Sequence, residues 1–542
     1  MAAIKDFVRE HNSSTRLAGL GQHIALLAIA ILLVYLTSTA VYRSFFHPLA
    51  RYPGPFLAKL TPWWDVYHAY KGDKHLLFHR LHEQYGDFVR YGPNTVSINN
   101  PAALKAIYGH RANVRKSDFY LSFPAVPGAF STHTALDLKM HARKRRVMSH
   151  AFSDSALKGV EDFVLEHVSA YINALTDRFN RSNTAPHSDK WTTPKNISTW
   201  STYLGFDVMG DLAFGSGFGM LTGTKPANRD APVLLMQAAK RHNTTGPMPW
   251  LHQSGVDRIL FRKLNLDRDQ YLAFSRNQVG ERMASGALDS KRKDFFYYLL
   301  HSKDPETGEG FSKKELWGES NTLIIAGSDT TSTTLTSTIF YLLHNPATLA
   351  RLQQEIRGAF ESVEEIRAGP TLNDCKYLRA CIDEALRMSP PVGAILPRQT
   401  LAGGIDILDH HIPEGVGVGC PIYALHHHQD YIPAAFDYKP ERWIKGECDE
   451  KENEALLSVF NPFSIGSRGC IGKPMAYMEL SLALARLLWK FDMRLPEGSL
   501  KHAGEGRRGL GQGRERSSEF QMWDIFVSDK DGPYAEFRER SD

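Results

Sequence analysis

The chain has little cysteine and no strongly basic region. Its 542 residues include five cysteines without a repeated spacing, which argues against a disulfide-stapled scaffold and indicates a reducing compartment for the soluble part. The net charge is only +5, and no basic tract is interleaved with aromatic residues, so nucleic-acid binding is not expected. A linker-like stretch is also lacking. Helical patterns continue along the chain, which favours one large domain although the length alone would allow about three.

Charge is absent from one long apolar stretch near the N-terminus. Residues 24–42 read IALLAIAILLVYLTSTAVY, which is long enough to span a bilayer. We interpret this stretch as a transmembrane anchor that follows a short tail over residues 1–23. A signal peptide cleaved near Ala40 and a buried core helix are the alternatives. Basic residues balance on the two sides, so counting them leaves the orientation open.

Prolines are concentrated directly after the apolar stretch. Pro48, Pro53 and Pro55 lie in FHPLARYPGPF, where they restrict the backbone and remove amide donors. We therefore predict a stiff hinge over residues 43–56 between the membrane and a globular domain over residues 57–542. The content of 42% hydrophobic and 23% charged residues gives that domain ample material for a core.

The remaining chain is predominantly helical in its hydrophobic periodicity. Apolar residues recur at helical intervals through most of residues 135–365. Residues 87–98 read as a β-hairpin around Tyr91-Gly92-Pro93-Asn94, residues 101–109 as a helix, and short strand-like pieces lie at 395–420 and 519–527. The predicted fold class is mainly α with small β-sheets.

One cysteine lies in a glycine-rich loop that runs directly into an amphipathic helix. Cys470 stands between Gly466 and Gly472 in NPFSIGSRGCIGKPMAYMEL, and glycine can take backbone angles that are closed to other residues. The positive end of the following helix would stabilise a Cys470 thiolate, the form that binds iron. Arg468 adds a charge suited to a haem propionate. A buried structural cysteine beside a glycine turn is the alternative.

The cysteine loop resembles a known haem-binding signature. Phe463, Gly466, Arg468, Cys470 and Gly472 fit Phe-x-x-Gly-x-Arg-x-Cys-x-Gly at every fixed position, as in the cytochrome P-450 monooxygenases. The resemblance implies the cytochrome P-450 fold, haem b (iron protoporphyrin IX) as cofactor, and Cys470 as the axial thiolate ligand of the iron. It also implies electrons from NADPH through a reductase, and the insertion of one oxygen atom from O2 into an apolar organic substrate.

A second motif of the same family lies upstream, in a long apolar helix that carries polar residues. Ala326, Gly327, Asp329, Thr330 and Thr331 fit the family's oxygen-binding helix. Small residues at 326 and 327 would let the backbone approach the haem. The resemblance implies that Thr330 donates a hydrogen bond to bound dioxygen and that Asp329 connects it to a proton supply. An ordinary helix whose hydroxyls bond back to its own carbonyls is the alternative.

A charged pair and one further arginine fit another part of the family pattern. Glu384 and Arg387 are three residues apart in CIDEALRMSP, so on a helix they share a face. An exposed pair would contribute little to stability, and this is the alternative. The resemblance adds Arg442, from FDYKPERW, and implies that the three residues form a structural network behind the haem.

Further arginines resemble the family's propionate partners. HARKRRVMSHAF places Arg145 at the fixed arginine of a Trp-x-x-x-Arg helix, with His141 where tryptophan is usual. Arg398 in AILPRQT matches another propionate position. A plain basic helix face is the alternative for this helix, and such a face could dock an acidic electron donor. By resemblance, residues 123–132, 392–396 and 522–525 would contact substrate.

Smaller likenesses suggest the biological setting. HPLARYPGP and NVRKSDFY resemble microsomal members from filamentous fungi, which implies secondary-metabolite biosynthesis. Such members are single-pass proteins of the endoplasmic reticulum with a lumenal tail and a cytosolic catalytic domain, and this topology would make Asn12 a glycosylation site. A haem-thiolate isomerase or dehydratase that uses no O2, and a non-catalytic haem-binding sensor, are the alternative functions.

Overall fold

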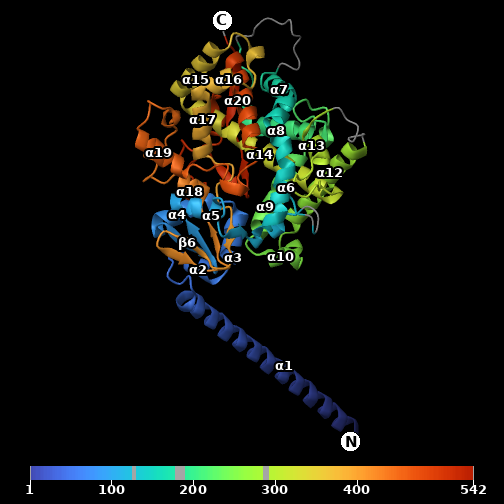
Figure 1. Ribbon diagram of the computed structural model, residues 1–542. Coiled ribbons are helices and arrows are strands. Elements are labelled where there is room, and N and C mark those ends of the chain that lie inside the picture. Colours follow the sequence, from blue (N-terminus) through green and yellow to red (C-terminus); the bar gives the residue numbers. More distant parts are fainter. Residues whose placement is uncertain (1, 125–127, 129, 178–189, 285–291, 541–542) are drawn as a thin grey trace.

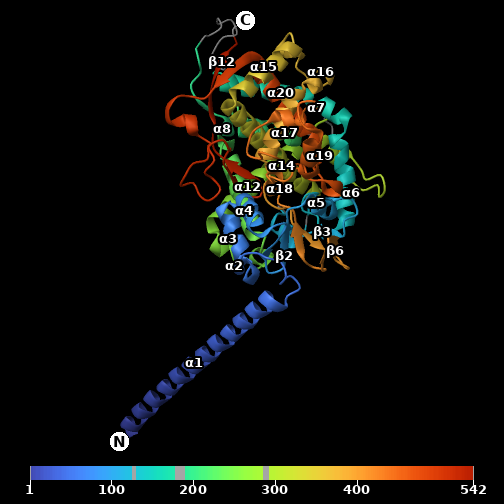
Figure 2. The ribbon, with the colours of Figure 1, turned by 90° about the vertical axis from the view of Figure 1, so that its left-hand side faces the viewer.

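A computed structural model describes residues 2–124, 128, 130–177, 190–284 and 292–540, with residues 2–21 described by their backbone. A helical body carries one group of strands at the end from which one long helix extends away, and further strands near the opposite end (Figures 1 and 2). This arrangement confirms the predicted fold class of a mainly α protein with small β-sheets.

Twenty α-helices are assigned in the described residues. The first ten are α1 Ala2–Val41, α2 Phe56–Leu60, α3 Trp63–Lys71, α4 Lys74–Tyr85, α5 Pro101–Tyr108, α6 Leu138–Ser149, α7 Asp154–Leu175, α8 Ile197–Phe214, α9 Ala231–Thr245 and α10 Pro249–Gln253. The others are α11 Asp257–Leu260, α12 Arg262–Ala284, α13 Phe295–His301, α14 Lys313–His344, α15 Pro346–Ala359, α16 Pro370–Asp374, α17 Lys376–Met388, α18 Ile422–His426, α19 Glu450–Val459 and α20 Lys473–Lys490.

The described residues form four small sheets, and the two larger ones combine strands from distant parts of the chain. The five-stranded sheet has the order β1 Phe88–Gly92, β2 Thr95–Ile98, β8 Gly417–Gly419, β5 Arg398–Thr400 and β3 Val114–Lys116. The three-stranded sheet has the order β4 Lys195–Asn196, β12 Tyr534–Glu539 and β9 Phe491–Arg494; two-stranded sheets join β10 Met522–Asp524 to β11 Ser528–Lys530 and β6 Ile405–Ile407 to β7 His410–Ile412. The predicted hairpin is confirmed as β1 and β2, whereas β3, β9 and β12 were not predicted.

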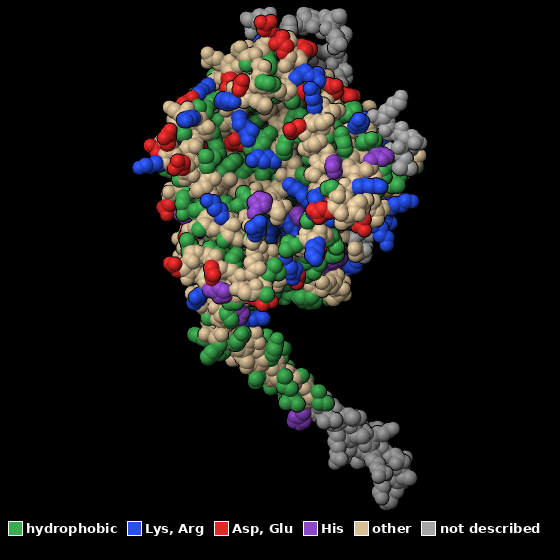
Figure 3. Space-filling view, in the orientation of Figure 1, with side chains coloured by type: hydrophobic (Ala, Val, Ile, Leu, Met, Phe, Trp, Pro, Cys, Tyr) green, Lys and Arg blue, Asp and Glu red, His purple; other side chains and the backbone are tan. Residues whose placement is uncertain are grey.

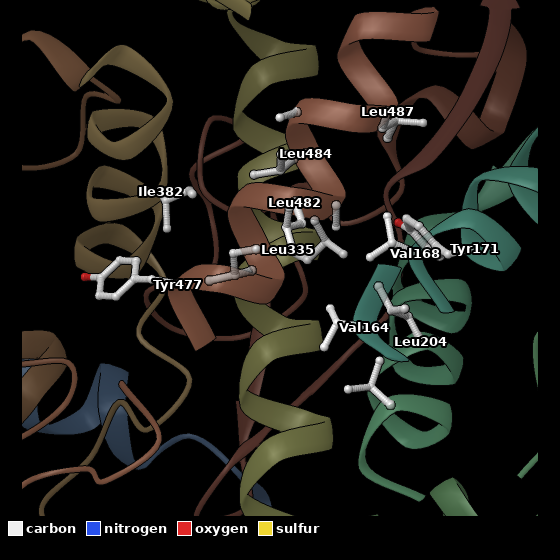
Figure 4. Close-up of a cluster of buried hydrophobic side chains, with 14 of the residues drawn as sticks. Val164, Val168, Tyr171, Leu204, Leu335, Ile382, Tyr477, Leu482, Leu484 and Leu487 are labelled. Carbon is white, nitrogen blue, oxygen red and sulfur yellow. The ribbon is translucent and has the colours of Figure 1, made fainter. Parts of the chain in front are cut away.

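The core is built around α14, which α8 crosses at very short range. A Cβ atom added at Gly205 of α8 would lie 2.4 Å from the Ser328 carbonyl oxygen of α14. One added at Gly327 of α14 would lie 2.4 Å from the sulfur of Met209. Gly205 is therefore needed for this helix contact, whereas a larger residue at 327 would require the flexible Met209 side chain to move. Figure 4 shows the adjoining hydrophobic cluster, to which α7, α8, α14, α17 and α20 contribute Val164, Leu204, Leu335, Ile382 and Leu484 among others.

Helix α1 leaves the body and has the length and composition of a membrane span. The apolar segment is Gln22–Phe46, with a mean hydropathy of 2.5. No residue in its most apolar part is buried in the protein. Hydrophobic side chains cover the described part of this helix (Figure 3). The apolar segment contains the predicted anchor at residues 24–42.

The segment predicted as a hinge, residues 43–56, packs against the body. Leu49 and Tyr52 are buried in one hydrophobic cluster with strands β1, β2 and β8. Arg90 donates from its guanidinium to the Arg43 carbonyl at 2.7 Å and from its backbone N–H to the Pro53 carbonyl at 2.7 Å. The segment also donates, since the Arg51 guanidinium bonds to the His411 carbonyl at 2.7 Å. Hydrogen bonds in both directions therefore hold it to the body.

Candidate functional site

A cavity of about 320 Å³ lies inside the helical body, beside α14 and the start of α20. Most of its lining is apolar, with a limited set of polar side chains, as in a small-molecule site. Three predicted motifs that are far apart in sequence meet there. The predicted site residues on its wall are Ala326, Gly327, Thr330, Arg398, Phe463, Arg468, Cys470 and Gly472.

The cysteine loop is closed by backbone hydrogen bonds. The Cys470 N–H donates to the Phe463 carbonyl at 2.9 Å, and the Gly469 N–H donates to the Gly466 carbonyl at 3.0 Å. Gly466 has φ +69°, and a Cβ there would lie 2.1 Å from the Tyr108 carbonyl oxygen, so this position requires glycine. Gly472 has φ −81°, which any residue can adopt. The expectation of special backbone angles is thus correct for Gly466 and wrong for Gly472.

The environment of the Cys470 sulfur has opposing effects on its ionisation. Burial raises the pKa of the Cys470 thiol, whereas hydrogen bonds from the backbone of Gly472 and Lys473 and the charge of Arg145 lower it. The predicted helix-end stabilisation is therefore present, but burial outweighs it. Because Cys470 lines the cavity, its exposed surface faces that space, and a cation bound there would favour the thiolate.

Three cations gather at one side of the cavity wall, two of them buried and the third, Arg468, half-buried, and we call Lys116, Arg398 and Arg468 the cation cluster. Each donates to a carbonyl oxygen: Lys116 to His133, Arg398 to Leu396 at 3.2 Å, and Arg468 to Ala135 at 2.6 Å. Arg398 also donates to the Tyr120 hydroxyl at 3.4 Å. Within the described chain, none of the three forms a salt bridge with a carboxylate.

The cation cluster is electrostatically unfavourable on its own. Lys116 on β3 and Arg398 on β5 are direct cross-strand partners, and like charges in such a pair repel each other. Burial, followed by the charges of Arg398 and Arg468, holds the pKa of Lys116 well below its ordinary value. Burial and Arg398 lower the pKa of Arg468 to about 10. The arrangement would be stabilised by an anionic ligand such as the two propionates of a haem.

The other two predicted propionate partners lie on α6, away from the cavity lining. Arg145 donates to the Gly469 carbonyl at 2.8 Å and so ties α6 to the cysteine loop. His141 is buried, and burial together with neighbouring cations, Arg468 first, lowers its pKa to about 3. A neutral imidazole keeps one N–H donor. The roles of both residues toward a haem stay predictions.

The alternative of a free basic face on α6 does not hold. Arg143 pairs with Glu315 at 2.5 Å, and Lys144, which is buried, pairs with the same carboxylate at 2.6 Å. Arg146 pairs with Asp304 at 2.5 Å. Since these charges are compensated within the chain, they offer no free basic surface to an acidic partner.

Some residues of the α14 motif lie on the cavity wall, and Asp329 lies away from it. The Thr330 hydroxyl lines the cavity and donates to the Ala326 carbonyl at 2.6 Å, which is the back-bonding expected of an ordinary helix. Asp329 is absent from the lining; its Oδ1 lies 3.1 Å from Nζ of Lys530, and the two side chains are 2% and 3% exposed. Thr331 is largely buried and also lines the cavity.

Glu384, Arg387 and Arg442 meet in one buried network. The Arg387 guanidinium donates to both oxygens of Glu384, at 2.9 and 2.8 Å, and neither side chain is exposed. Nε of Arg442 lies 3.4 Å from Glu384 Oε1, and the Trp443 indole donates to the same carboxylate at 3.0 Å. Burial would raise the pKa of Glu384, but the two guanidinium groups hold it below its ordinary value. The alternative of an exposed pair is excluded.

We expect Arg387→Gln to lower the free energy of unfolding by about 3–5 kcal/mol, because it leaves a buried carboxylate without its bidentate partner. Arg351→Gln provides a control, since Arg351 pairs with Glu447 where both side chains are more than a third exposed, and about 1 kcal/mol or less is expected. Denaturant unfolding of the purified proteins measures both changes. Equal effects of the two substitutions would contradict the structural role of the network.

The cavity wall agrees only in part with the predicted substrate-contacting stretches. Phe123, Val392 and Leu396 line the cavity, as predicted, and residues 125–127 and 129 lie outside the described residues. From the C-terminal turn, Phe526 and Val527 line it, rather than residues 522–525. Among the lining residues that the sequence did not indicate is a group from α9 and α12: Leu235, Ala238, Ala239, His242, Arg268, Tyr271 and Leu272.

Comparison with known proteins agrees with the predicted family. A family model described as Cytochrome P450 matches residues 55–516. The chain is 39% identical to "Cytochrome P450 monooxygenase apf7" of Gibberella fujikuroi, over 92% of this chain and 95% of the relative. It is 40% identical to "Cytochrome P450 monooxygenase AKT7" of Alternaria alternata, over 94% and 96% of the two chains, and 40% identical to "Cytochrome P450 monooxygenase atnE" of Emericella nidulans, over 92% and 94%.

Proposed function

The chain belongs to the cytochrome P450 family and is a monooxygenase, and from this premise we propose that it binds haem b in the cavity through Cys470 and oxidises an apolar organic substrate there. The observation that carries the proposal is the cavity wall itself. On this wall, Cys470 lies just before α20, and the three residues of the cation cluster have no carboxylate partner in the described chain.

Each group on the wall has a definite role in this proposal. Cys470 would supply the thiolate ligand to iron, and the cation cluster would hold the propionates through charge-assisted hydrogen bonds. Gly466 keeps the loop flat against Tyr108, and Arg145 fixes the loop to α6 through the Gly469 carbonyl. When bound, the haem supplies the oxygen-activating chemistry.

Thr330 and Asp329 would manage the proton that oxygen insertion requires. The Thr330 hydroxyl stands on the cavity wall, where it can donate a hydrogen bond toward the reaction space. Asp329, its neighbour on α14, holds its charge against Lys530 in a nearly water-free position. Rotation of the Asp329 carboxylate away from Lys530 would place it as a proton carrier between the protein interior and Thr330.

The relatives also bear on the alternative functions and on the setting. Those reported above are named monooxygenases of fungi, which favours oxygen insertion over a haem-thiolate isomerase or dehydratase and over a non-catalytic sensor. We place the enzyme in fungal secondary-metabolite biosynthesis. We place it in the endoplasmic reticulum membrane, with residues 1–23 in the lumen, residues 24–42 as anchor, and the domain over residues 57–542 in the cytosol. NADPH would supply electrons through a reductase.

The test is reconstitution of the purified full-length protein in lipid with NADPH and a fungal P450 reductase. We expect a haem b signature in the pyridine haemochrome spectrum. We also expect NADPH oxidation that requires both the reductase and an extract of the producing fungus. Haem binding without such substrate-dependent turnover would instead support a sensor, and product formation without O2 would support an isomerase.

Removal of residues 1–42 is expected to release most of the protein from membranes while haem binding is kept, because α1 makes no part of the cavity. Some membrane affinity should remain. Exposed apolar side chains of α2, α3 and α10, at the end of the body from which α1 leaves (Figure 1), are Phe56, Leu57, Trp63, Tyr67 and Trp250. Sedimentation with liposomes measures the binding. Loss of haem from the truncated protein would contradict the anchor interpretation.

A further inference from the structure

Three nearly buried polar groups line the cavity with an atom that has no hydrogen-bond partner in the described chain. They are Nε of Arg268, the hydroxyl of Tyr271 and Oδ1 of Asn321. These residues are 7%, 1% and 5% exposed, respectively. An unpaired polar group in such a position costs stability, so each of these atoms calls for a ligand.

The three groups come from two helices that meet at the cavity. Arg268 and Tyr271 are three residues apart on α12 and therefore share a face. Asn321 lies on α14, and Ile325, one turn further along the same face, also lines the cavity. Ile325 packs against the hydrophobic cluster that contains Tyr271. The groups thus face one region of the cavity wall, which we call the α12 subsite.

Arg268 is only weakly compensated by its neighbours. Its Nη1 donates to Asp269 at 3.2 Å and its Nη2 to the Pro124 carbonyl at 3.3 Å, both of which are long for charge-assisted contacts. The Asp269 side chain is substantially exposed, so solvent screens its charge. Asp257, another acid nearby, is already paired with Arg241. A positive charge therefore remains at the α12 subsite.

Arg268 lies on α12, whereas the cation cluster comes from β3, β5 and the cysteine loop, and the charges that act on Arg268 come from other residues. Burial and then Arg241 lower the pKa of Arg268 to about 10, and the other charges that act on it are Asp269, Arg258 and Asp257. None of these belongs to the cation cluster, whose members act on one another. A haem held by the cation cluster would therefore leave Arg268 without an anionic partner.

We propose that the substrate is an apolar molecule with a carboxylate, and that Arg268 binds this carboxylate with Tyr271 as a second donor. Nε and Nη2 form the edge of a guanidinium that receives a carboxylate side-on. The amide of Asn321 can accept from or donate to an adjacent polar group of the substrate. The neighbouring part of the cavity wall is apolar and is formed by Leu235, Ala238, Ala239 and Leu272. This inference rests on the proposed function, in which the same cavity holds haem and substrate.

The charge balance favours a carboxylate over a phosphate. One cation and two neutral polar groups suit one negative charge, whereas a phosphate dianion would remain partly uncompensated in an apolar cavity. Fixing the carboxylate at α12 also fixes its distance from the reaction space near Thr330. Oxidation is therefore expected at a carbon remote from the carboxylate.

The test is a titration of the purified holoenzyme with each probe, in which binding is measured from the shift of the haem Soret band. The probes are straight-chain acids from octanoic to hexadecanoic acid and their methyl esters. We expect an acid to bind more tightly than its ester by about tenfold or more. Arg268→Gln should weaken binding of the acids by about tenfold to a hundredfold, as expected for hydrogen bonds to a charged group, and should leave the esters unchanged.

Two variants serve as controls. Lys263→Gln removes a cation from the exposed side of α12 and should not change acid binding. Arg268→Lys keeps the charge without the planar fork, so intermediate affinity is expected. The thiolate-type carbon monoxide spectrum of each variant shows that haem is still bound, which separates this test from failure of the proposed function. Equal binding of acids and esters, no binding of any acid, or unchanged acid binding by Arg268→Gln would overturn the proposal.

Discussion

Replacement of Cys470 by alanine is expected to abolish the thiolate-type Soret band of the reduced, carbon monoxide-bound protein. No other cysteine in the described residues lines the cavity. Cys375, Cys381 and Cys420 are buried elsewhere in the fold, so none can replace the ligand without rearrangement of the backbone. Oxygen insertion should fall to background in the same variant, because the variant lacks the thiolate that would support the oxygen-activating chemistry of a bound haem.

The matched control is Cys448→Ala, which removes a partly exposed thiol outside the cavity. This variant should keep both the band and the activity. Measurement of haem content by the pyridine haemochrome method separates loss of the ligand from loss of the cofactor. A Cys470→Ala protein that keeps the thiolate-type band would exclude Cys470 as the axial ligand.

Thr330→Ala and Asp329→Asn are expected to reduce product formation by about 10²-fold each, while haem stays bound. The first substitution removes the hydroxyl at the cavity wall. The second removes the carboxylate that could carry a proton from the interior. NADPH oxidation should continue and the release of hydrogen peroxide should increase, because electrons still reach the active site while proton delivery to it is impaired. Product, NADPH and peroxide are measured together in the reconstituted system.

Thr338→Ala is the control for the hydroxyl substitution. Thr338 lies on the same helix and bonds back to the Thr334 carbonyl at 2.7 Å, but it does not line the cavity. Asp329→Asn leaves the buried ammonium of Lys530 without its carboxylate, so its thermal stability must be measured alongside. Full coupling of electrons to product in both Thr330→Ala and Asp329→Asn would exclude the proposed proton delivery.

Features encoded in short segments were predictable from the sequence. The cysteine loop, the α14 motif and the Glu384–Arg387 pair each depend on spacing within one helix or turn. The cavity brings the first two together, and the third forms the expected buried network. Gly472 was misjudged because a glycine in a loop does not by itself reveal its backbone angles.

Features that depend on contacts between distant segments were not predictable. Lys116 joins the cation cluster only because β3 pairs with β5. The Asp329–Lys530 pair depends on the placement of the C-terminal hairpin against α14. In the sequence, Arg268 is one of several charged residues on α12. Only its burial at the cavity distinguishes it from the others. Sequence spacing carries no information about such long-range partners.

The docking of residues 43–56 has a practical consequence for exchanging membrane anchors between relatives. Arg90 donates hydrogen bonds to the carbonyls of Arg43 and Pro53, and Leu49 and Tyr52 pack in the hydrophobic cluster beside the first sheet. A chimera should therefore be spliced before Arg43. A junction placed after Tyr52 would expose the apolar sites that Leu49 and Tyr52 fill. It would also remove one of the three carbonyl partners of the buried Arg90 guanidinium. We therefore expect such a protein to aggregate for reasons unrelated to its new anchor.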